Sequence, residues 1–212
     1  PFVGVGGTLL GCSLAGRRGI GIELENKYLK IYKKVCDQLA LKEQLVANGD
    51  SRQIESILKK LGNKKTKIPK QVDLILTDPP YANMMIKKRT ANIQESSKGK
   101  LSTPFSKNPK DIGNLELDNF LDELKEITES SLRFLKNKKY LIMFIKDMQP
   151  KEDHDNMLHA DVVRKLSEIE CVKFKGYKVW FDHTQMLFPL GYPYAFVANI
   201  FHQFILIFRK EE

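Results

Sequence analysis

The stretch Val72-Asp73-Leu74-Ile75-Leu76-Thr77-Asp78-Pro79-Pro80-Tyr81 decides how the rest of the chain is interpreted. Its first half, Val72 to Leu76, is an apolar run of strand length rich in branched side chains, which predicts a strand of a sheet. The two prolines that follow keep Asp78 and Pro79 out of helical geometry. The sequence therefore predicts a stiff turn at the carboxyl end of a strand, which is where open α/β sheets bind ligands.

This turn brings together a carboxylate, backbone carbonyls without helix partners and a flat ring, from Asp78, Pro79, Pro80 and Tyr81. Such groups suit a planar amino group, because the acceptors can take its hydrogens and the ring can stack on its face. A strand followed by a Pro-Pro turn without any binding role explains the same four residues equally well. The choice between the two interpretations depends on the rest of the chain.

Size and composition limit the possible classes of protein. The chain has 212 residues, which suits one domain, and its 35 Lys and Arg against 26 acidic residues leave a net charge of +9. This excess favours an anionic partner, most often nucleic acid, although a basic surface can also serve solubility alone. Three widely spaced cysteines and the lack of a leader or long apolar run predict a cytoplasmic protein that does not contact a membrane.

The chain opens with a glycine-rich loop. Gly4, Gly6 and Gly7 predict a tight turn whose backbone can approach a ligand, and Thr8 is expected to cap the helix that follows. A short strand over residues 18–23 then ends in Glu23. In nucleotide-binding folds an acid at the end of the second strand accepts from ribose hydroxyls, so this order favours a nucleotide site over a purely structural turn.

A third short strand, over residues 45–51, ends in Asp50 and Ser51 between helices expected over 26–41 and 52–61. Asp50 can accept from a base amino group of a cofactor or cap the next helix, and the pattern does not separate these roles. A glycine loop of this kind follows a buried strand, yet the chain begins at Pro1, inside the motif. Either residues ahead of Pro1 supply that strand, or the chain is a split or truncated one that lacks it.

Three polar or aromatic stretches have competing interpretations. Residues 82–113 form a basic insert that can contact a nucleic-acid backbone or act as a lid. Residues 187–194 are rich in aromatic residues and proline, and they suit either base stacking or a packed hairpin loop. The loosely spaced Asp153, His154, Asp155 and His159 predict a solvated loop rather than a metal site.

The remaining patterns complete the fold prediction. Helices are expected over 118–135 and 159–170, and strands over 139–147, 171–182 and 201–209. The order of these elements predicts one α/β domain over 1–212, with a doubly wound, mostly parallel sheet and an antiparallel C-terminal hairpin.

Four blocks of the sequence resemble the S-adenosylmethionine-dependent amino-methyltransferases of DNA, which methylate adenine at N6 or cytosine at N4. Residues 1–8 (PFVGVGGT) resemble the cofactor loop of that family, although an extra glycine, Gly7, precedes Thr8. Residues 17–23 (RRGIGIE) resemble the strand whose acid holds the cofactor ribose. Asp78-Pro79-Pro80-Tyr81 matches the catalytic tetrapeptide, and residues 201–210 (FHQFILIFRK) resemble the closing strand. The Asp that the family has before Pro1 is absent.

The resemblance implies a Rossmann-like methyltransferase fold, S-adenosylmethionine as cofactor, DNA as partner, as in restriction-modification, and no metal. It implies that Asp78 and the Pro79 carbonyl accept the amine hydrogens and that Tyr81 stacks on the base, with Pro80 completing the turn. The cofactor residues that it implies are Pro1, Phe2, Gly4, Gly6, Thr8, Glu23, Leu24, Asp50 and Ser51.

Three other functions stay open from the sequence. An RNA amino-methyltransferase would use the same tetrapeptide. A nicotinamide oxidoreductase shares the glycine loop and the ribose acid but does not explain Asp78-Pro79-Pro80-Tyr81. A nucleic-acid-binding module without catalysis would follow if the part before Pro1 is essential for activity.

Overall fold

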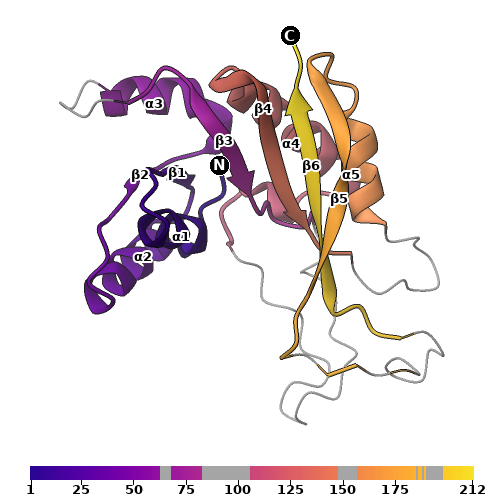
Figure 1. Ribbon diagram of the computed structural model, residues 1–212, viewed down its shortest axis with the longest axis horizontal. Helices are drawn as coiled ribbons and strands as arrows, with labels where there is room; N and C mark the ends of the chain where they lie inside the picture. The colour runs from indigo at the N-terminus through magenta and orange to yellow at the C-terminus, as the bar shows by residue number, and fades with distance from the viewer. Residues whose placement is uncertain (63–67, 83–105, 148–156, 185, 188, 190–197) are drawn as a thin grey trace.

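The computed structural model describes residues 1–62, 68–82, 106–147, 157–184, 186–187, 189 and 198–212. Helices and strands alternate over most of the chain (Figure 1). In order they are α1 (Gly7–Leu14), β1 (Ile20–Glu23), α2 (Asn26–Gln38), β2 (Leu45–Asn48), η1 (Ser51–Gln53), α3 (Ile54–Gly62), β3 (Val72–Thr77), η4 (Ile112–Asn114), α4 (Leu117–Leu132), β4 (Leu135–Ile145), α5 (Leu158–Leu166), β5 (Val172–Phe181) and β6 (His202–Lys210).

Strand pairing confirms the predicted fold class. Strands β1 and β2 pair in parallel, and so do β3 and β4. Strand β6 runs antiparallel between β4 and β5, which gives the order β3-β4-β6-β5. The antiparallel hairpin expected at the C-terminal end is therefore present, with β6 rather than β5 next to the parallel strands.

The structure differs from one continuous sheet at a single boundary. Among the described residues, β1 pairs only with β2, and β3 pairs on one side only, with β4. The first three residues lie between them (Figure 1): Val3 N–H donates to the Ile22 carbonyl of β1 at 3.1 Å, and the Thr77 hydroxyl of β3 donates to the Pro1 carbonyl at 2.8 Å. Hydrogen bonding through the sheet is thus interrupted between β1 and β3.

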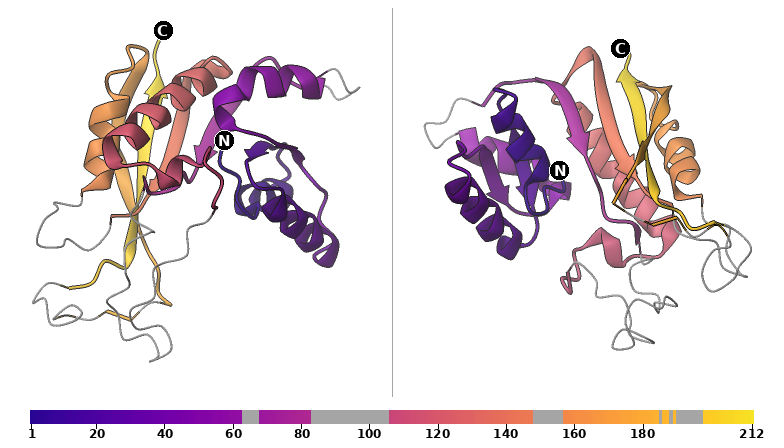
Figure 2. Two further views of the ribbon diagram at one scale, coloured as in Figure 1. Left: turned by 180° about the vertical axis from the view of Figure 1, so that it is seen from behind. Right: turned by 60° about the horizontal axis from the view of Figure 1, so that its bottom comes forward.

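The main core lies between the four-stranded sheet and the helices α4 and α5, which cover one of its faces (Figure 2). Its fully buried members include Phe120 and Leu124 of α4, Met143 of β4, and Leu206 and Phe208 of β6. Burying a side chain of this size contributes roughly 1.5–3 kcal/mol, so this layer anchors the strands that end at the site. A smaller core of Leu9, Tyr32 and Cys36 joins α1 to α2.

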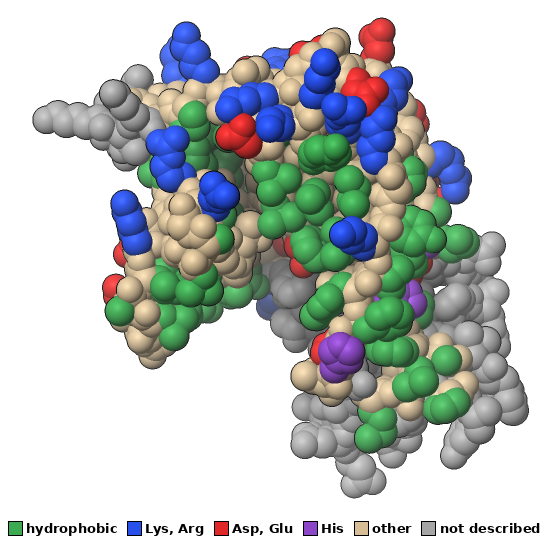
Figure 3. All heavy atoms as spheres, in the orientation of Figure 1, with side chains coloured by type: hydrophobic (Ala, Val, Ile, Leu, Met, Phe, Trp, Pro, Cys, Tyr) green, Lys and Arg blue, Asp and Glu red, His purple; other side chains and the backbone are tan. Residues whose placement is uncertain are grey.

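The other face of the four-stranded sheet is apolar and open to solvent. Leu74 of β3 is 47% exposed and Tyr140, its partner on β4, is 41% exposed. Figure 3 shows hydrophobic side chains gathered over these strands, with Lys and Arg around them. Sheets that contain parallel strands are usually covered on both faces, so this surface is unusual.

Several element boundaries differ from the sequence prediction; for example, the strand expected over 45–51 ends at Asn48, before Asp50 and Ser51. Helix α1 begins at Gly7 with Gly6 as its N-cap, so Thr8 lies inside the first turn and the expected Thr8 cap is wrong. Strand β4 begins at Leu135 rather than Lys139, because Leu135 pairs with Val72 before a bulge. None of the helices in the described ranges has the length and apolar character to cross a membrane.

Candidate active site

A cavity of about 440 Å³ opens at the carboxyl ends of β1, β2 and β3. The glycine loop and the ends of β1 and β2 form one wall, the turn after β3 forms another, and residues just before α4 form a third. Because the carboxyl ends of parallel strands face the same edge of a sheet, the fold brings together groups far apart in the chain.

The cavity holds all the predicted site residues except Pro1 and Gly6. Those that line it are Phe2, Gly4, Thr8, Glu23, Leu24, Asp50, Ser51, Asp78, Pro79, Pro80 and Tyr81. Pro1 lies behind the wall, where its carbonyl accepts from Thr77. Gly6 has a packing role, because its φ is 88° and a Cβ atom there would lie 2.2 Å from Cδ2 of Tyr32.

Glu23 ties the end of β1 to the glycine loop. Its Oε2 accepts from the Gly4 N–H at 2.7 Å, and its Oε1 accepts from the Glu25 N–H at 2.8 Å. Burial raises the pKa of Glu23, and these two N–H bonds oppose the rise. Each carboxylate oxygen keeps a further lone pair, so Glu23 can still accept from a pair of hydroxyls.

Asp50 serves as a cap and as half of an ion pair. It is the N-cap of η1, accepting from the Arg52 N–H at 3.0 Å, and its carboxylate lies 2.9 Å from the Arg52 guanidinium. The Arg52 side chain thus occupies both oxygens of Asp50. Of the two roles left open for Asp50, the structure shows the helix cap. Asp50 also lines the cavity, and its role toward a cofactor stays a prediction.

The third wall is the segment 106–114, here called the strap. The Ser106 hydroxyl donates to Glu25 at 2.6 Å, and the Arg52 guanidinium donates to the Lys110 carbonyl at 2.6 Å. Asp111 of the strap also faces the cavity, and burial raises its pKa. The strap was assigned to the basic insert 82–113, of which residues 83–105 lie outside the described part of the chain. The composition of this segment does not predict that it lines the cavity, because contacts with distant residues, Glu25 and Arg52, place it there.

The turn after β3 contains a chain of hydrogen bonds. The Tyr81 hydroxyl donates to Asp78 Oδ1 at 2.7 Å, and Gln203 Nε2 of β6 donates to the Tyr81 oxygen at 3.3 Å. Burial raises the pKa of Asp78, while the Tyr81 bond lowers it. Burial and the nearby Asp78 charge raise the pKa of Tyr81, so its hydroxyl stays protonated and acts as a donor. Sequence reasoning placed Gln203 in the closing strand without assigning it to the site.

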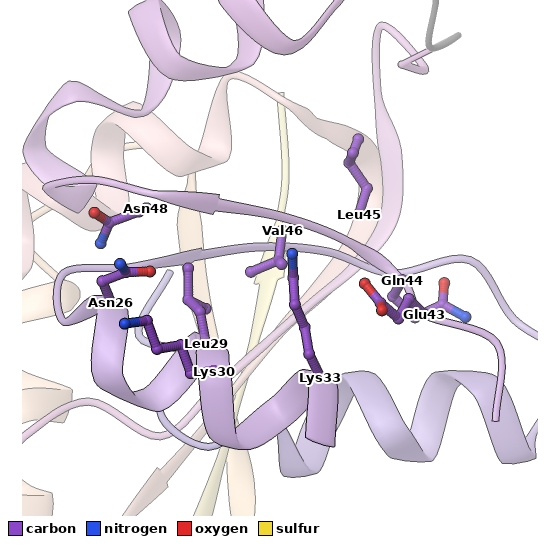
Figure 4. Close-up of a pocket in the computed structure, with 9 residues that line it drawn as sticks. All are labelled: Asn26, Leu29, Lys30, Lys33, Glu43, Gln44, Leu45, Val46 and Asn48. Carbon is purple, nitrogen blue, oxygen red and sulfur yellow. The ribbon is translucent and has the colours of Figure 1, made fainter. Parts of the chain in front are cut away.

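A second cavity, of about 490 Å³, lies between α2 and β2 (Figure 4). Lys30 and Lys33 reach from α2 alongside Val46 of β2, and Glu43 and Gln44 lie at the other end. This cavity contains none of the groups at the carboxyl ends of β1 and β3. The residues that the sequence predicts for the site therefore lie at the first cavity and not at the second.

The stretches considered for metal binding and base stacking lie largely outside the described residues, as do Asp153, His154 and Asp155. His159 is described, and its Nδ1 lies 2.6 Å from Asp147 Oδ2 while its ring stacks on Phe204. The described part of the chain contains no group of three His, Cys, Asp or Glu that could hold a metal ion.

Comparison with known proteins places the chain by fold. No family model matches the sequence, and no curated protein matches it. Among solved structures, TrmN from Thermus thermophilus superposes with a TM-score of 0.58 at 11% identity, over 99% of this chain and 42% of that one. An rRNA methylase from Streptococcus thermophilus gives 0.51 at 9% identity, over 99% of this chain and 83% of that one.

A third match widens the range of chemistry on this fold. A structure titled for the conversion of a disulfide bond into a thioacetal group during echinomycin biosynthesis gives a TM-score of 0.51 at 11% identity, over 99% of this chain and 73% of that one. At such identities the likeness is one of fold. It agrees with the predicted Rossmann-like methyltransferase fold and leaves the substrate to be argued from the site.

Proposed function

We propose that this protein transfers a methyl group from S-adenosylmethionine to the exocyclic amino group of adenine or cytosine in DNA. The observation that carries the proposal is a single cavity that joins the glycine loop and Glu23 to the turn Asp78–Tyr81. A nucleotide-binding wall alone would fit many cofactor enzymes. The Asp78 carboxylate and the Pro-Pro carbonyls on the opposite wall add acceptors suited to an amine.

The cavity suits a nucleoside that carries positive charge. Gly4 allows close backbone approach, and Glu23 keeps lone pairs for ribose hydroxyls. Asp78 and Asp111 add negative charge to the same cavity, which favours a sulfonium and an ammonium group. When bound there, S-adenosylmethionine would supply an electrophilic methyl group.

The turn after β3 would then orient the amino nitrogen of the target base for methyl transfer. A target base turned out of its duplex would place its amino group at Asp78, with Asp78 Oδ2 and the Pro79 carbonyl accepting its two hydrogens. Tyr81 already holds Oδ1, so it leaves the other oxygen for the amine. S-adenosylmethionine bound in the cavity would supply the methyl group to this nitrogen, and the Asp78 carboxylate would take up the proton that the nitrogen loses. Positioning would supply most of the rate gain.

The direct test is transfer of labelled methyl groups from S-adenosylmethionine to DNA, with calorimetry for cofactor binding. We expect label on adenine or cytosine with the native chain, and none with Asp78→Ala. Cofactor binding in Asp78→Ala should be largely kept, since Glu23 and the glycine loop are intact. Transfer by Asp78→Ala at the native rate would rule out this mechanism.

RNA is the second polymer to test, because the same turn would serve it and an rRNA methylase shares the fold. Labelling of RNA but not DNA would move the assignment to RNA. Binding of a nicotinamide dinucleotide instead of S-adenosylmethionine would favour an oxidoreductase. Binding of DNA without any cofactor would favour a module that does not catalyse.

A further inference from the structure

The end of the β5–β6 hairpin lies against the proposed catalytic turn. Gln203 of β6 donates to the Tyr81 hydroxyl, which in turn donates to Asp78. Strand β6 also pairs with β5, the edge strand of the sheet, and Gln203 is directly opposite Trp180 in that pairing. Directly opposed residues of antiparallel strands lie on the same face of the sheet, with Cβ atoms about 5 Å apart. Trp180 is therefore the neighbour of Gln203, the residue that contacts Tyr81.

Trp180 is presented to solvent with a lysine beside it. Its side chain is 49% exposed, and Lys178, two residues earlier on the same strand, is exposed as well. Residues two apart on a strand point to the same side, so the indole and the ammonium group share the face that carries Gln203. Strand β5 carries Lys173, Lys175 and Lys178 and no acidic residue.

The opposite face of this hairpin end is braced by ring contacts. Phe181 lies 5.7 Å from Phe201 and 6.0 Å from His202 between ring centroids, and His202 lies 5.2 Å from Phe204. These contacts hold β5 and β6 together up to their ends. The position of Trp180 is therefore fixed by the pairing of the strands and not by a free loop.

We propose that Trp180 and Lys178 bind a DNA nucleotide next to the target base, with the base stacked on the indole and its phosphate near the lysine. This inference rests on the proposed function, because it takes the target base to lie at Asp78. Aromatic stacking accepts any base, since every base has a π-face, and lysine on the same face matches the charge of the backbone. This surface would position the DNA strand at the site, and other residues would determine the specificity for base sequence.

The chain contains a single tryptophan, so its own fluorescence reports on this surface. We would titrate the full chain, with S-adenosylhomocysteine present, with a short single-stranded DNA and with the same strand made abasic beside the target base. We expect saturable quenching with the first and much weaker quenching with the second. A labelled strand followed by anisotropy should show affinity lowered about tenfold by Trp180→Ala and kept largely intact by Trp180→Phe.

Tyr140→Ala is the matched control, because Tyr140 is an exposed ring in the middle of β4, where it pairs with Leu74 and not with the turn after β3. It should leave DNA affinity unchanged. Calorimetry with S-adenosylmethionine should give native affinity for both alanine variants, which shows that the cavity is folded.

Three results would overturn the proposal. These are unchanged indole fluorescence at saturating DNA, equal quenching by the abasic strand, or a Trp180 effect seen with RNA and not with DNA. Failure of the proposed function is a separate result, since it would appear as no cofactor binding or no methyl transfer by the native chain.

Discussion

Asp78 is the residue at which stability and proposed activity oppose each other. Burial raises its pKa, so at neutral pH the charged form costs stability, and this cost disappears as the pH falls through the raised pKa. We expect Asp78→Asn to raise Tm at neutral pH, where each 1 kcal/mol gained appears as roughly 2–4 °C. The same change should lower methyl transfer by about 100-fold or more. Thermal unfolding and the methyl-transfer assay measure the two effects.

Asp73→Asn is the control on the same strand. Its hydrogen bond to Lys136 lowers the pKa of Asp73, which is the opposite direction. Neutralising this exposed side chain should leave transfer at the native level and give no gain in Tm. If both variants raised Tm equally, the effect would come from net charge and not from burial of Asp78.

Gly6 and Gly7 are adjacent glycines that differ in backbone conformation and in the space available for a side chain. Gly6 has a φ of 88°, and a Cβ atom there would collide with buried Tyr32, whereas a Cβ atom at Gly7 meets nothing within 4 Å. Gly6→Ala should lower the free energy of unfolding by about 2–4 kcal/mol. Gly7→Ala, at the start of α1, should raise it by about 0.5–1 kcal/mol. Chemical denaturation of the two variants checks both, and equal effects would contradict the structure.

At the scale of elements, one side chain, Arg52, connects the strap to the end of β2 and to α4. Arg52 follows β2 and binds Asp50, the Lys110 carbonyl of the strap and Glu123 of α4, the last at 3.3 Å. Arg52→Met would release the strap and leave Asp50 without its partner. We expect cofactor affinity to fall about tenfold, because the cavity loses its preorganised wall. Arg52→Lys should restore only part of it, since one ammonium group cannot bind three segments in the same geometry.

Arg133→Met is the control for Arg52. Arg133 pairs with Glu55 on the surface, where ion pairs contribute about 0–1 kcal/mol. Calorimetry should show native cofactor affinity for this variant. A similar loss in both would mean that Arg52 acts through charge alone.

Sequence reasoning placed most elements but missed contacts made across the fold. The apolar run 72–76 predicted β3, because a local pattern is enough to indicate a strand of this length. The predicted start of β4, at Lys139, lies after the observed start at Leu135. The residues from Lys136 to Lys139 are polar, and only the pairing with β3 makes them part of the strand. Gln203 and Ser106 joined the site through partners 122 and 81 residues away, and no local pattern predicts such contacts.

At the scale of the whole molecule, strand pairing in the described part of the chain stops between β1 and β3. Contacts of side chains and loops therefore connect the β1–β2 pair to the four-stranded sheet.

The boundary between β1 and β3 also sets how the molecule opens to solvent. The two sheets are tied across it by polar contacts, among them Thr77 to Pro1, Ser106 to Glu25 and Arg52 to Lys110. Water can replace each of these, so we expect the backbone amides of β1 and β2 to exchange hydrogen sooner than those of β4 and β6. A molecule bound in the cavity touches both sheets, so it should slow exchange most on the β1–β2 side. The bound ligand would then be the contact that most limits the opening of the β1–β2 pair away from the four-stranded sheet.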